Sequence, residues 1–482
     1  MIHWANILKI LGYFTLALSG TLGLVTLYAY ANSDSGLMPL LQATAVSACA
    51  GVLGVLFRQK PHELSHREGI LLVALAWMAA GVFGALPFYF SEYFLSFTDS
   101  VFESISGFTT TGATVLSDIE AVPESLLFWR SFTHWIGGMG IILLGIAILP
   151  LIGAGGMELY RAEFSGARSE KLKPRIAETS LALWRIYASL SVSLYLALRW
   201  AGMGPFDAIT HTFSTMGTGG FSTRNISIEA FASPLIEFTI VFFMILAGIN
   251  FTRYYRLLIE RRPGSFLRDM EIQGYLAILA LATLGVTLER SLNSTLSFFD
   301  SFRLALFQVA SIMTTTGFSS ADYELWSPFS QLLLLALMFI GGCTGSTAGG
   351  LKAARIVLLF RVVSREFHRM VERRGVFSIR IDGRAVRENS IQSLLNLVYL
   401  AFLVNFAASL ALTALGIDML TAISSVAASM FNVGPALGAL GPYDNYGHLP
   451  TAAKWILSFC MLAGRLEFYT LVILFTASFW RK

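Results

Sequence analysis

The sequence predicts an all-α membrane protein with two N-terminal transmembrane helices, followed by four internal repeats around one central pore. Composition is the first observation behind this prediction. Of 482 residues, 55% are hydrophobic and 13% are charged, and the mean hydropathy is +0.65. A soluble domain carries about 25% charged residues. The second observation is a Thr/Gly turn that follows an apolar run at four places in the chain.

The apolar runs are long enough to cross a membrane, which takes about 20 residues for a ~30 Å hydrocarbon core. Ten crossings are predicted, at 7–30, 38–57, 69–91, 125–150, 178–201, 233–253, 272–290, 327–370, 391–416 and 450–479. The first has no cleavage-site pattern and is interpreted as a retained helix. Cys49, Cys343 and Cys460 are scattered and predict neither a metal site nor a disulfide framework.

The basic residues indicate the orientation of these crossings. Most of the 34 lysines and arginines follow the second, fourth, sixth and eighth crossings, in the stretches Arg58–Arg67, Arg161–Arg175, Arg253–Arg268 and Lys352–Arg387. The positive-inside rule makes that face cytoplasmic and puts both termini inside. A bacterial cytoplasmic (inner) membrane is the expected location.

The four turns end at Gly112, Gly219, Gly317 and Gly434, and all fall on the opposite, outer side. Each follows a segment too short to span, and Asp99, Asp207, Asp300 and Asp418 lie near the starts of those segments, where a carboxylate suits a helix N-terminus. The predicted repeat unit is therefore a crossing, a re-entrant half-helix with its turn, and a second crossing. The expected divisions are a hairpin over 1–60 and repeats over 61–155, 156–262, 263–375 and 376–482.

The chemistry of such turns is ion dehydration. Backbone carbonyls replace the water around a cation without adding formal charge, and glycine permits conformations in which carbonyls converge. The fourth turn departs from the others because it reads Asn432-Val433-Gly434-Pro435. The predicted ion-binding residues are Thr110, Thr111, Gly112, Gly217, Thr218, Gly219, Thr315, Thr316, Gly317, Asn432, Val433 and Gly434.

The chain resembles the Trk/Ktr/HKT superfamily of potassium transporters, and within it the bacterial TrkH pore subunits, over essentially its full length. The stretches that carry the resemblance are 107–114, 216–223, 314–318 and 341–352. In that family, members that prefer sodium have a serine in place of the glycine of the first filter turn. The resemblance therefore implies, from Gly112, that potassium is the transported ion. It implies no organic cofactor. The resemblance also implies a homodimer and a cytosolic ring of nucleotide-binding regulatory subunits of the TrkA type. Membrane lipid, and not nucleic acid, is the other expected partner.

The eighth predicted crossing is interrupted by a glycine-rich stretch over 341–350, where each glycine disfavours a helix by about 1 kcal/mol. Non-helical backbone is tolerated at membrane depth where it lines a cavity. We expect an intramembrane gate below the filter, and a close helix contact through small residues is the alternative. The predicted gating residues are Gly341, Gly342, Gly345, Ser346, Thr347, Gly349, Gly350 and Arg465.

Arg465 lies inside the last predicted crossing, where a charge is costly unless it faces a cavity or a partner. The resemblance places it beside the permeation path as an electrostatic barrier. An ion pair or a snorkelling side chain is the alternative. Glu467, two residues on, is expected to point elsewhere on the same helix.

Two classes of alternative function remain to be compared with a potassium pore: a membrane enzyme and another kind of ion transporter. A membrane enzyme is disfavoured because the sequence has no metal-ligand cluster, no nucleophile with a base at readable spacing and no phosphate loop. His134 and His211 are interpreted as packing or capping residues. A channel, a proton- or sodium-coupled symporter and a sodium-permeable relative share the predicted architecture, and the sequence does not separate them.

Overall fold

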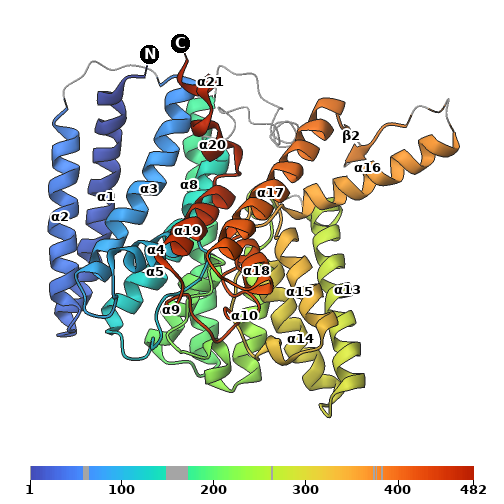
Figure 1. Ribbon diagram of the computed structural model, residues 1–482, viewed down its shortest axis with the longest axis horizontal. Helices are drawn as coiled ribbons and strands as arrows, with labels where there is room; N and C mark the ends of the chain where they lie inside the picture. The colour runs from blue at the N-terminus through green and yellow to red at the C-terminus, as the bar shows by residue number, and fades with distance from the viewer. Residues whose placement is uncertain are drawn as a thin grey trace.

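The computed structural model describes residues 2–57, 64–147, 172–261, 264–372, 375, 377–381 and 384–481, and in these ranges it is almost entirely helical (Figure 1). The predicted all-α class is confirmed. Two short strands, β1 (Arg380–Ile381) and β2 (Arg384–Ala385), pair antiparallel at one end of the bundle. Of the predicted basic stretches, most of Arg58–Arg67 and Arg161–Arg175 lies outside the described residues.

The N-terminal hairpin consists of α1 (Trp4–Ala31) and α2 (Leu37–Val55). Glycines let the two helices approach closely, because a Cβ on Gly12 would lie 2.7 Å from the backbone carbon of Gly54. At the turn between them, Asp34 accepts a hydrogen bond of 2.6 Å from the Ser125 hydroxyl at the start of α5. This bond ties the hairpin to the first repeat.

Four groups of helices follow in chain order, as the repeats require. The first group consists of α3 (His66–Tyr89), α4 (Phe97–Phe108) and α5 (Glu124–Ala147). The second consists of α8 (Leu172–Trp200), α9 (Pro205–Met216), α10 (Pro234–Ala247), α11 (Phe251–Leu258) and α12 (Gly264–Leu267). The third consists of α13 (Met270–Asn293), α14 (Phe298–Met313), α15 (Pro328–Ile340) and α16 (Ala353–Val371), and the fourth consists of α17 (Glu388–Ala414), α18 (Met419–Met430), α19 (Thr451–Arg465), α20 (Tyr469–Val472) and α21 (Ala477–Trp480). Short 3-10 turns occupy Ser227–Phe231, Tyr323–Leu325 and Ile473–Phe475.

The half-helices α4, α9, α14 and α18 are the second helix of each group. Ser96 and Ser297 cap α4 and α14 by accepting the backbone N–H of Asp99 and Asp300, and Asp418 caps α18 itself. Asp99 and Asp300 therefore lie in the first turn of their helices and are not the capping residues. Their carboxylates accept hydrogen bonds of 2.8 and 2.7 Å from the hydroxyls of the capping serines. In α9 the cap position is Gly204, followed by Pro205.

Three predicted crossings are not single helices. The sixth bends by 90° between α10 and α11, the tenth bends by 116° after α19, and the eighth is interrupted between α15 and α16. At the first bend the Asn250 side chain caps α11. After α19, Glu467 and Phe468 adopt φ of 58° and 49°, which ends the helix. The expectation that Glu467 continues that helix is wrong.

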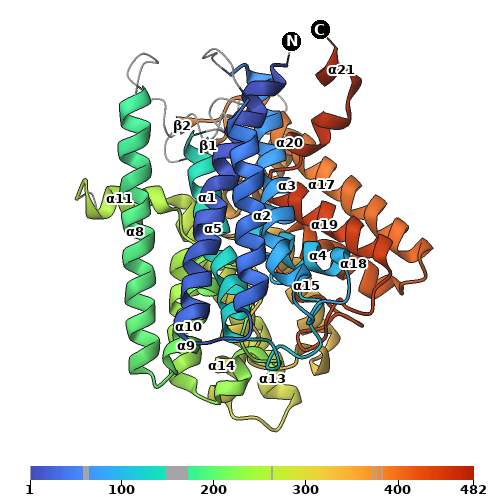
Figure 2. The ribbon, with the colours of Figure 1, turned by 90° about the vertical axis from the view of Figure 1, so that its left-hand side faces the viewer.

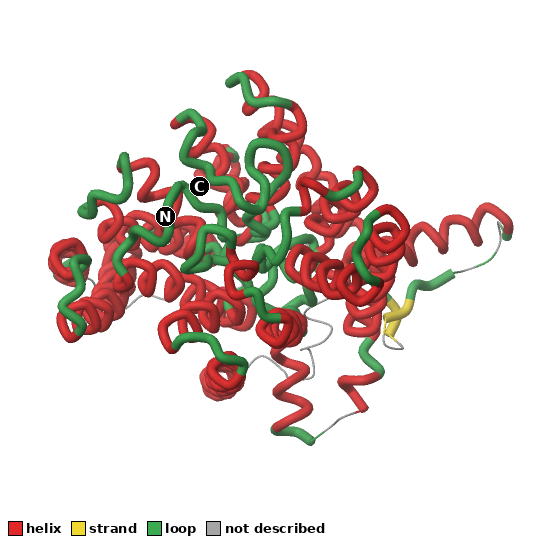
Figure 3. The backbone as a smooth tube through the Cα atoms, turned by 90° about the horizontal axis from the view of Figure 1, so that it is seen from below, coloured by secondary structure: helices red, strands yellow, loops and turns green. Residues whose placement is uncertain are grey.

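Among the described residues, six helices are long and apolar enough to cross a membrane, and eight spans result if each bent pair counts as one. The two chain ends lie on the same side of the bundle (Figure 1). Seen from the opposite side, loops gather at the middle of the molecule and helices surround them (Figure 3). These central loops contain the candidate site.

Candidate functional site

The four turns share one backbone conformation. Each half-helix ends in a Schellman motif, in which a left-handed residue follows the helix and the next N–H returns to a carbonyl five residues earlier. The left-handed residues Thr110, Thr218, Thr315 and Asn432 have φ of 54°, 54°, 56° and 56°. The returning bonds, from Thr111, Gly219, Thr316 and Val433 to Ser106, Ser214, Ser311 and Ala428, measure 2.7–2.8 Å.

A glycine with positive φ comes two residues after each left-handed residue: Gly112 (85°), Gly220 (78°), Gly317 (80°) and Gly434 (99°). These glycines close a ring. A Cβ on Gly112 would lie 2.0 Å from the carbonyl oxygen of Gly219 in the next repeat, one on Gly220 2.0 Å from that of Thr316, one on Gly317 2.0 Å from that of Val433, and one on Gly434 2.5 Å from that of Thr111. Each repeat contacts the next and the fourth contacts the first. The carbonyl groups of Thr111, Gly219, Thr316 and Val433 therefore surround one axis.

The ring corrects the register of the second repeat. Gly220, and not Gly219, is the structural equivalent of Gly112, and Gly219 corresponds to Thr111. The sequence contained the signal, since Thr218-Gly219-Gly220 repeats the Thr-x-Gly spacing of the first and third turns. Gly219 lacks a side chain because His134 packs there, with its ring 2.4–2.6 Å from an added Cβ. His134 also stacks on Phe221, with the ring centroids 4.1 Å apart, and so has the predicted packing role.

Threonine hydroxyls brace the turns. The hydroxyls of Thr109 and Thr111 lie 2.8 Å apart, and those of Thr314 and Thr316 repeat this distance in the third turn. In the fourth turn, Asn432 makes a hydrogen bond to another repeat. Its side-chain amide donates to the Thr111 hydroxyl over 3.0 Å, and this bond joins the last repeat to the first. The departure of the fourth turn from the threonine pattern thus provides an additional cross-repeat hydrogen bond.

A buried ion pair supports the ring from behind. Glu103 of α4 accepts hydrogen bonds from the Thr114 hydroxyl (2.8 Å), the Val115 N–H (2.9 Å) and Arg130 Nε (2.6 Å). Arg130 in turn donates 2.9 Å to the carbonyl of Ser222 in the second repeat. Both side chains of the ion pair are at most 2% exposed. The pair therefore holds the chain segments after the first and second turns together, and no local pattern in the sequence predicts it.

Other buried polar groups hold the segments that leave the remaining turns. His211 of α9 binds the Ser222 hydroxyl over 2.9 Å, so it does more than pack or cap. Gln308 of α14 donates 3.0 Å to the carbonyl of Ala321. In the fourth repeat the Tyr446 hydroxyl donates 2.7 Å to the carbonyl of Gly434. Each contact holds a residue at, or two to four positions after, a ring glycine.

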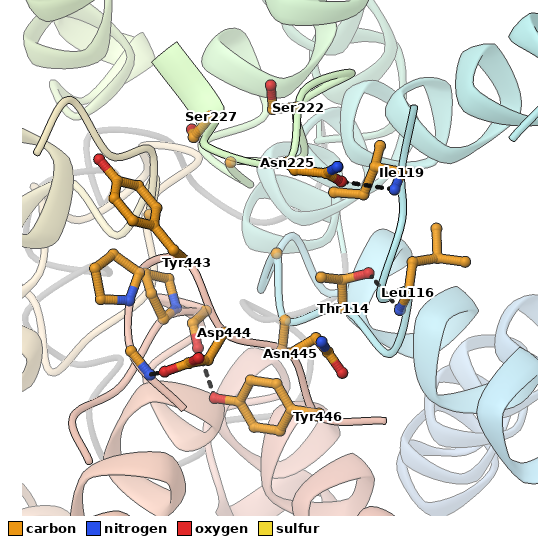
Figure 4. Close-up of a pocket in the computed structure, with 18 of the residues that line it drawn as sticks. Thr114, Leu116, Ile119, Ser222, Asn225, Ser227, Tyr443, Asp444, Asn445 and Tyr446 are labelled. Carbon is orange, nitrogen blue, oxygen red and sulfur yellow. Dashed lines mark hydrogen bonds between the residues drawn. The ribbon is translucent and has the colours of Figure 1, made fainter. Parts of the chain in front are cut away.

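A small cavity of about 80 Å³ lies against the four ring glycines and is lined by all four repeats. Its volume is enough for several water molecules. Figure 4 shows its rim, where Thr114, Asn225 and the 443–446 segment approach from different repeats. The ring therefore has a polar cavity on one side that is large enough for water.

The glycine-rich loop 341–350 lies against the ring through its own backbone. The Gly349 N–H donates 2.6 Å to the hydroxyl of Thr315, and the Gly350 N–H donates 3.2 Å to the carbonyl of Phe431. A Cβ on Gly349 would lie 2.2 Å from that Phe431 oxygen. The loop thus contacts the third and fourth turns, and glycine is required for this approach.

The same loop is hydrogen-bonded to the bend between α10 and α11. The Cys343 N–H donates 2.8 Å to the carbonyl of Gly248, and the Phe251 N–H donates 3.1 Å to the carbonyl of Gly345. Glu271 of α13 accepts the N–H of Thr344 over 2.5 Å. The two interruptions of helical backbone therefore satisfy each other's polar groups, as membrane depth demands.

Arg465 reaches the loop from the end of α19. It is 3% exposed, and it donates 2.8 Å to the carbonyl of Thr347 in the loop and 3.3 Å to the carbonyl of Gly137 in α5. Among the described residues no carboxylate forms an ion pair with it. Glu467 pairs instead with Arg355 of α16, through two contacts of 3.0 Å. The charge of Arg465 is therefore held by carbonyl dipoles of the loop and of α5.

Comparison with known proteins gives the family. Residues 39–482 match the TrkH family, which is described as a cation transport protein. The chain is 42% identical over 487 residues to the Trk system potassium uptake protein TrkH of Salmonella typhimurium and, equally, to that of Escherichia coli K12, with 100% of each chain covered. It superposes on the crystal structure of the potassium transporter TrkH from Vibrio parahaemolyticus with a TM-score of 0.91 and 38% identity, over 100% of both chains. The chain belongs to the TrkH family of cation transport proteins.

Proposed function

We propose that this chain takes up K⁺ across the bacterial cytoplasmic membrane through a selectivity filter of backbone carbonyls. The observation that carries the proposal is the closed ring of four glycine–carbonyl contacts between successive repeats. The names of its relatives, Trk system potassium uptake proteins, identify the ion they transport. Gly112 at the first filter position, where sodium preference goes with serine in the wider superfamily, favours K⁺ over Na⁺.

The filter works by replacing water. A cation that enters from the hydrated cavity exchanges its water shell for the carbonyl oxygens of Thr111, Gly219, Thr316 and Val433. The C-terminal ends of the four half-helices, which carry partial negative charge, point to the same place. Because no formal negative charge is fixed in the ring, binding is weak enough for the ion to leave.

The loop 341–350 and Arg465 act as the gate. The loop occupies the side of the ring away from the hydrated cavity, and Arg465 adds a positive charge there that is held by backbone carbonyls. Repulsion between two unit charges ~4 Å apart is about 4 kcal/mol at an effective dielectric of roughly 20. Opening therefore requires the loop to withdraw and to take the arginine with it.

Regulation comes from a second protein on the cytoplasmic face. A nucleotide-binding subunit of the TrkA type would dock on the basic loops of a homodimer, and α16 carries Arg361, Arg365 and Arg369 on that side of the bundle. The relatives' names place them in a multi-component system. Calorimetry tests the assignment: the isolated chain should not bind ATP or NADH, and tight binding would contradict it.

Flux into liposomes that contain the purified chain tests the function. K⁺ and Rb⁺ should enter faster than Na⁺, and the rate should not require a pH or Na⁺ gradient; strict dependence on either gradient would instead indicate a coupled symporter. Gly112→Ser should lower K⁺ over Na⁺ selectivity more than it lowers protein abundance, because the serine Cβ would meet the Gly219 carbonyl at 2.0 Å. Unchanged selectivity in that variant would remove Gly112 from the filter.

A further inference from the structure

An apolar cavity lies on the flank of the first repeat, away from the ion path. Its volume is about 310 Å³, and α1, α3, the end of α4 and α5 form its walls. The lining is hydrophobic and includes Phe14, Leu18, Trp77, Phe108 and Gly140. Figure 2 shows this face of the molecule, with α1, α3 and α5 close together.

The cavity lies at the middle of the membrane. Its wall residues on α1 fall between 14 and 21 in a helix that runs from Trp4 to Ala31, and those on α3 fall between 73 and 80 in a helix from His66 to Tyr89. Both helices are long and apolar enough to span. Phe14, which lines the cavity, is 37% exposed. The medium that meets such side chains at this depth is the hydrocarbon of the bilayer.

Small residues keep the cavity open. Ala17, Ala76, Ala80 and Gly140 line it, and a Cβ on Gly140 would meet no atom within 4 Å. An apolar cavity of ~150 Å³ inside a protein stays dry and takes up benzene, and this one has about twice that volume. It is therefore large enough for a run of methylene groups, and the hydroxyl in its lining, that of Thr21, already donates a hydrogen bond of 2.7 Å to the carbonyl of Leu18.

We propose that this cavity binds one acyl chain of a bilayer phospholipid. The chain would lie against Phe108, the last residue of α4, directly before the first filter turn. It would also cover Gly137, whose carbonyl accepts the hydrogen bond from Arg465. The acyl chain thus fills the space behind the one place where the first turn, α5 and the gate arginine meet.

Photolabelling tests the site. The purified full-length chain is placed in phospholipid vesicles that contain a phosphatidylethanolamine with a photoreactive diazirine midway along one acyl chain, and the adducts are mapped by mass spectrometry. We expect adducts concentrated on residues 14–21, 73–80 and 136–140. The variant Gly140→Leu fills the cavity and should remove most of them, and leucine favours the helix over glycine.

Gly20→Leu is the matched control. Gly20 is an exposed helix glycine of α1 whose Cβ would also meet nothing within 4 Å, but it does not line the cavity. Adducts should persist in this variant. Even labelling over all exposed helices of the parent chain, undiminished labelling in Gly140→Leu, or cross-links between two copies of the chain through this cavity would overturn the proposal.

A second measurement needs no cavity-filling variant. Phospholipid with acyl chains brominated near their middle should quench Trp77 more strongly than Trp184, which lies inside the span of α8 and is 39% exposed. The signal of each is obtained by subtracting the spectrum of its Trp→Phe variant. Weaker quenching at Trp77 than at Trp184 would show that no acyl chain enters, and would overturn the proposal even if Gly140→Leu failed to fold.

Discussion

The ring of four turns and the loop 341–350 are both non-helical backbone at membrane depth, but different contacts hold them. The ring is built from one contact made four times, a glycine against a neighbouring carbonyl at 2.0–2.5 Å. The loop is held by contacts that occur once each, from Thr315, Phe431, Gly248, Glu271 and Arg465.

This difference predicts how each region responds to change. A substitution in the ring meets backbone that cannot move without distorting the adjoining repeat, so it should damage selectivity. The loop is bonded to side chains and helix ends that can adopt other positions, so loss of one contact should change how often it opens.

Gly220→Ala should abolish most K⁺ flux and selectivity. The new Cβ would lie 2.0 Å from the carbonyl oxygen of Thr316, and φ is 78°. Gly202→Ala is the control, because Gly202 has φ of 98° but open space around it. It should cost only the left-handed strain of ~1–2 kcal/mol. Equal flux in both variants, measured in liposomes at equal protein content, would show that the ring contact does not matter.

Glu103→Gln should destabilise the protein strongly and reduce selectivity. The substitution leaves Arg130 buried without its counter-charge, and breaking a buried pair in this way costs about 3–5 kcal/mol. Glu120→Gln removes the same charge from an exposed pair with Arg224, 46% and 40% exposed, which is worth about 0–1 kcal/mol. Thermal unfolding in detergent should separate the two variants clearly. A similar melting temperature for both would mean that the buried pair does not support the ring.

Arg465→Ala should raise basal K⁺ flux and leave the order of ion selectivity unchanged. It removes the charge beside the path and the hydrogen bond to the Thr347 carbonyl. Arg465→Lys keeps the charge and should stay near the parent rate. Shortening the loop should also raise flux. If the alanine variant folds and conducts at the parent rate, Arg465 is not a barrier.

Tyr446→Phe should lower selectivity slightly. It removes one hydrogen bond of 2.7 Å to the Gly434 carbonyl, a loss of about 1 kcal/mol. Tyr443→Phe is matched to it, since Tyr443 lines the same cavity and its hydroxyl has no partner among the described residues. The ratio of K⁺ to Na⁺ flux should fall only in the first variant. A fall of the same size in both would attribute the effect to the cavity lining.

The features that all four repeats share could be predicted from the sequence. The features that depend on a single contact between distant residues could not. The ten apolar runs and the four turns follow from local patterns, and the structure has helices at these places, although the sixth and tenth runs bend and the eighth is interrupted by the loop between α15 and α16. The equivalence of Gly219 with Gly112 is off by one residue, because two adjacent glycines satisfy the same pattern and only the contact with the Thr316 carbonyl distinguishes Gly220. Gly219 as an ion-binding residue stays a prediction.

The ion pair of Glu103 and Arg130 and the bend after Arg465 were not predictable for another reason. Both depend on groups far apart in the chain: Arg130 donates to the Ser222 carbonyl, and the salt bridge from Glu467 to Arg355 accompanies the end of α19. A single sequence carries no signal for such pairs.

Anomalous diffraction from crystals of the purified chain soaked in Rb⁺ or Tl⁺ shows whether the ring of four turns binds a monovalent cation. The account predicts a peak on the axis enclosed by the carbonyl oxygens of Thr111, Gly219, Thr316 and Val433, and loss of that peak in Gly220→Ala but not in Gly202→Ala. A peak elsewhere in the molecule, with none inside the ring, would contradict the account.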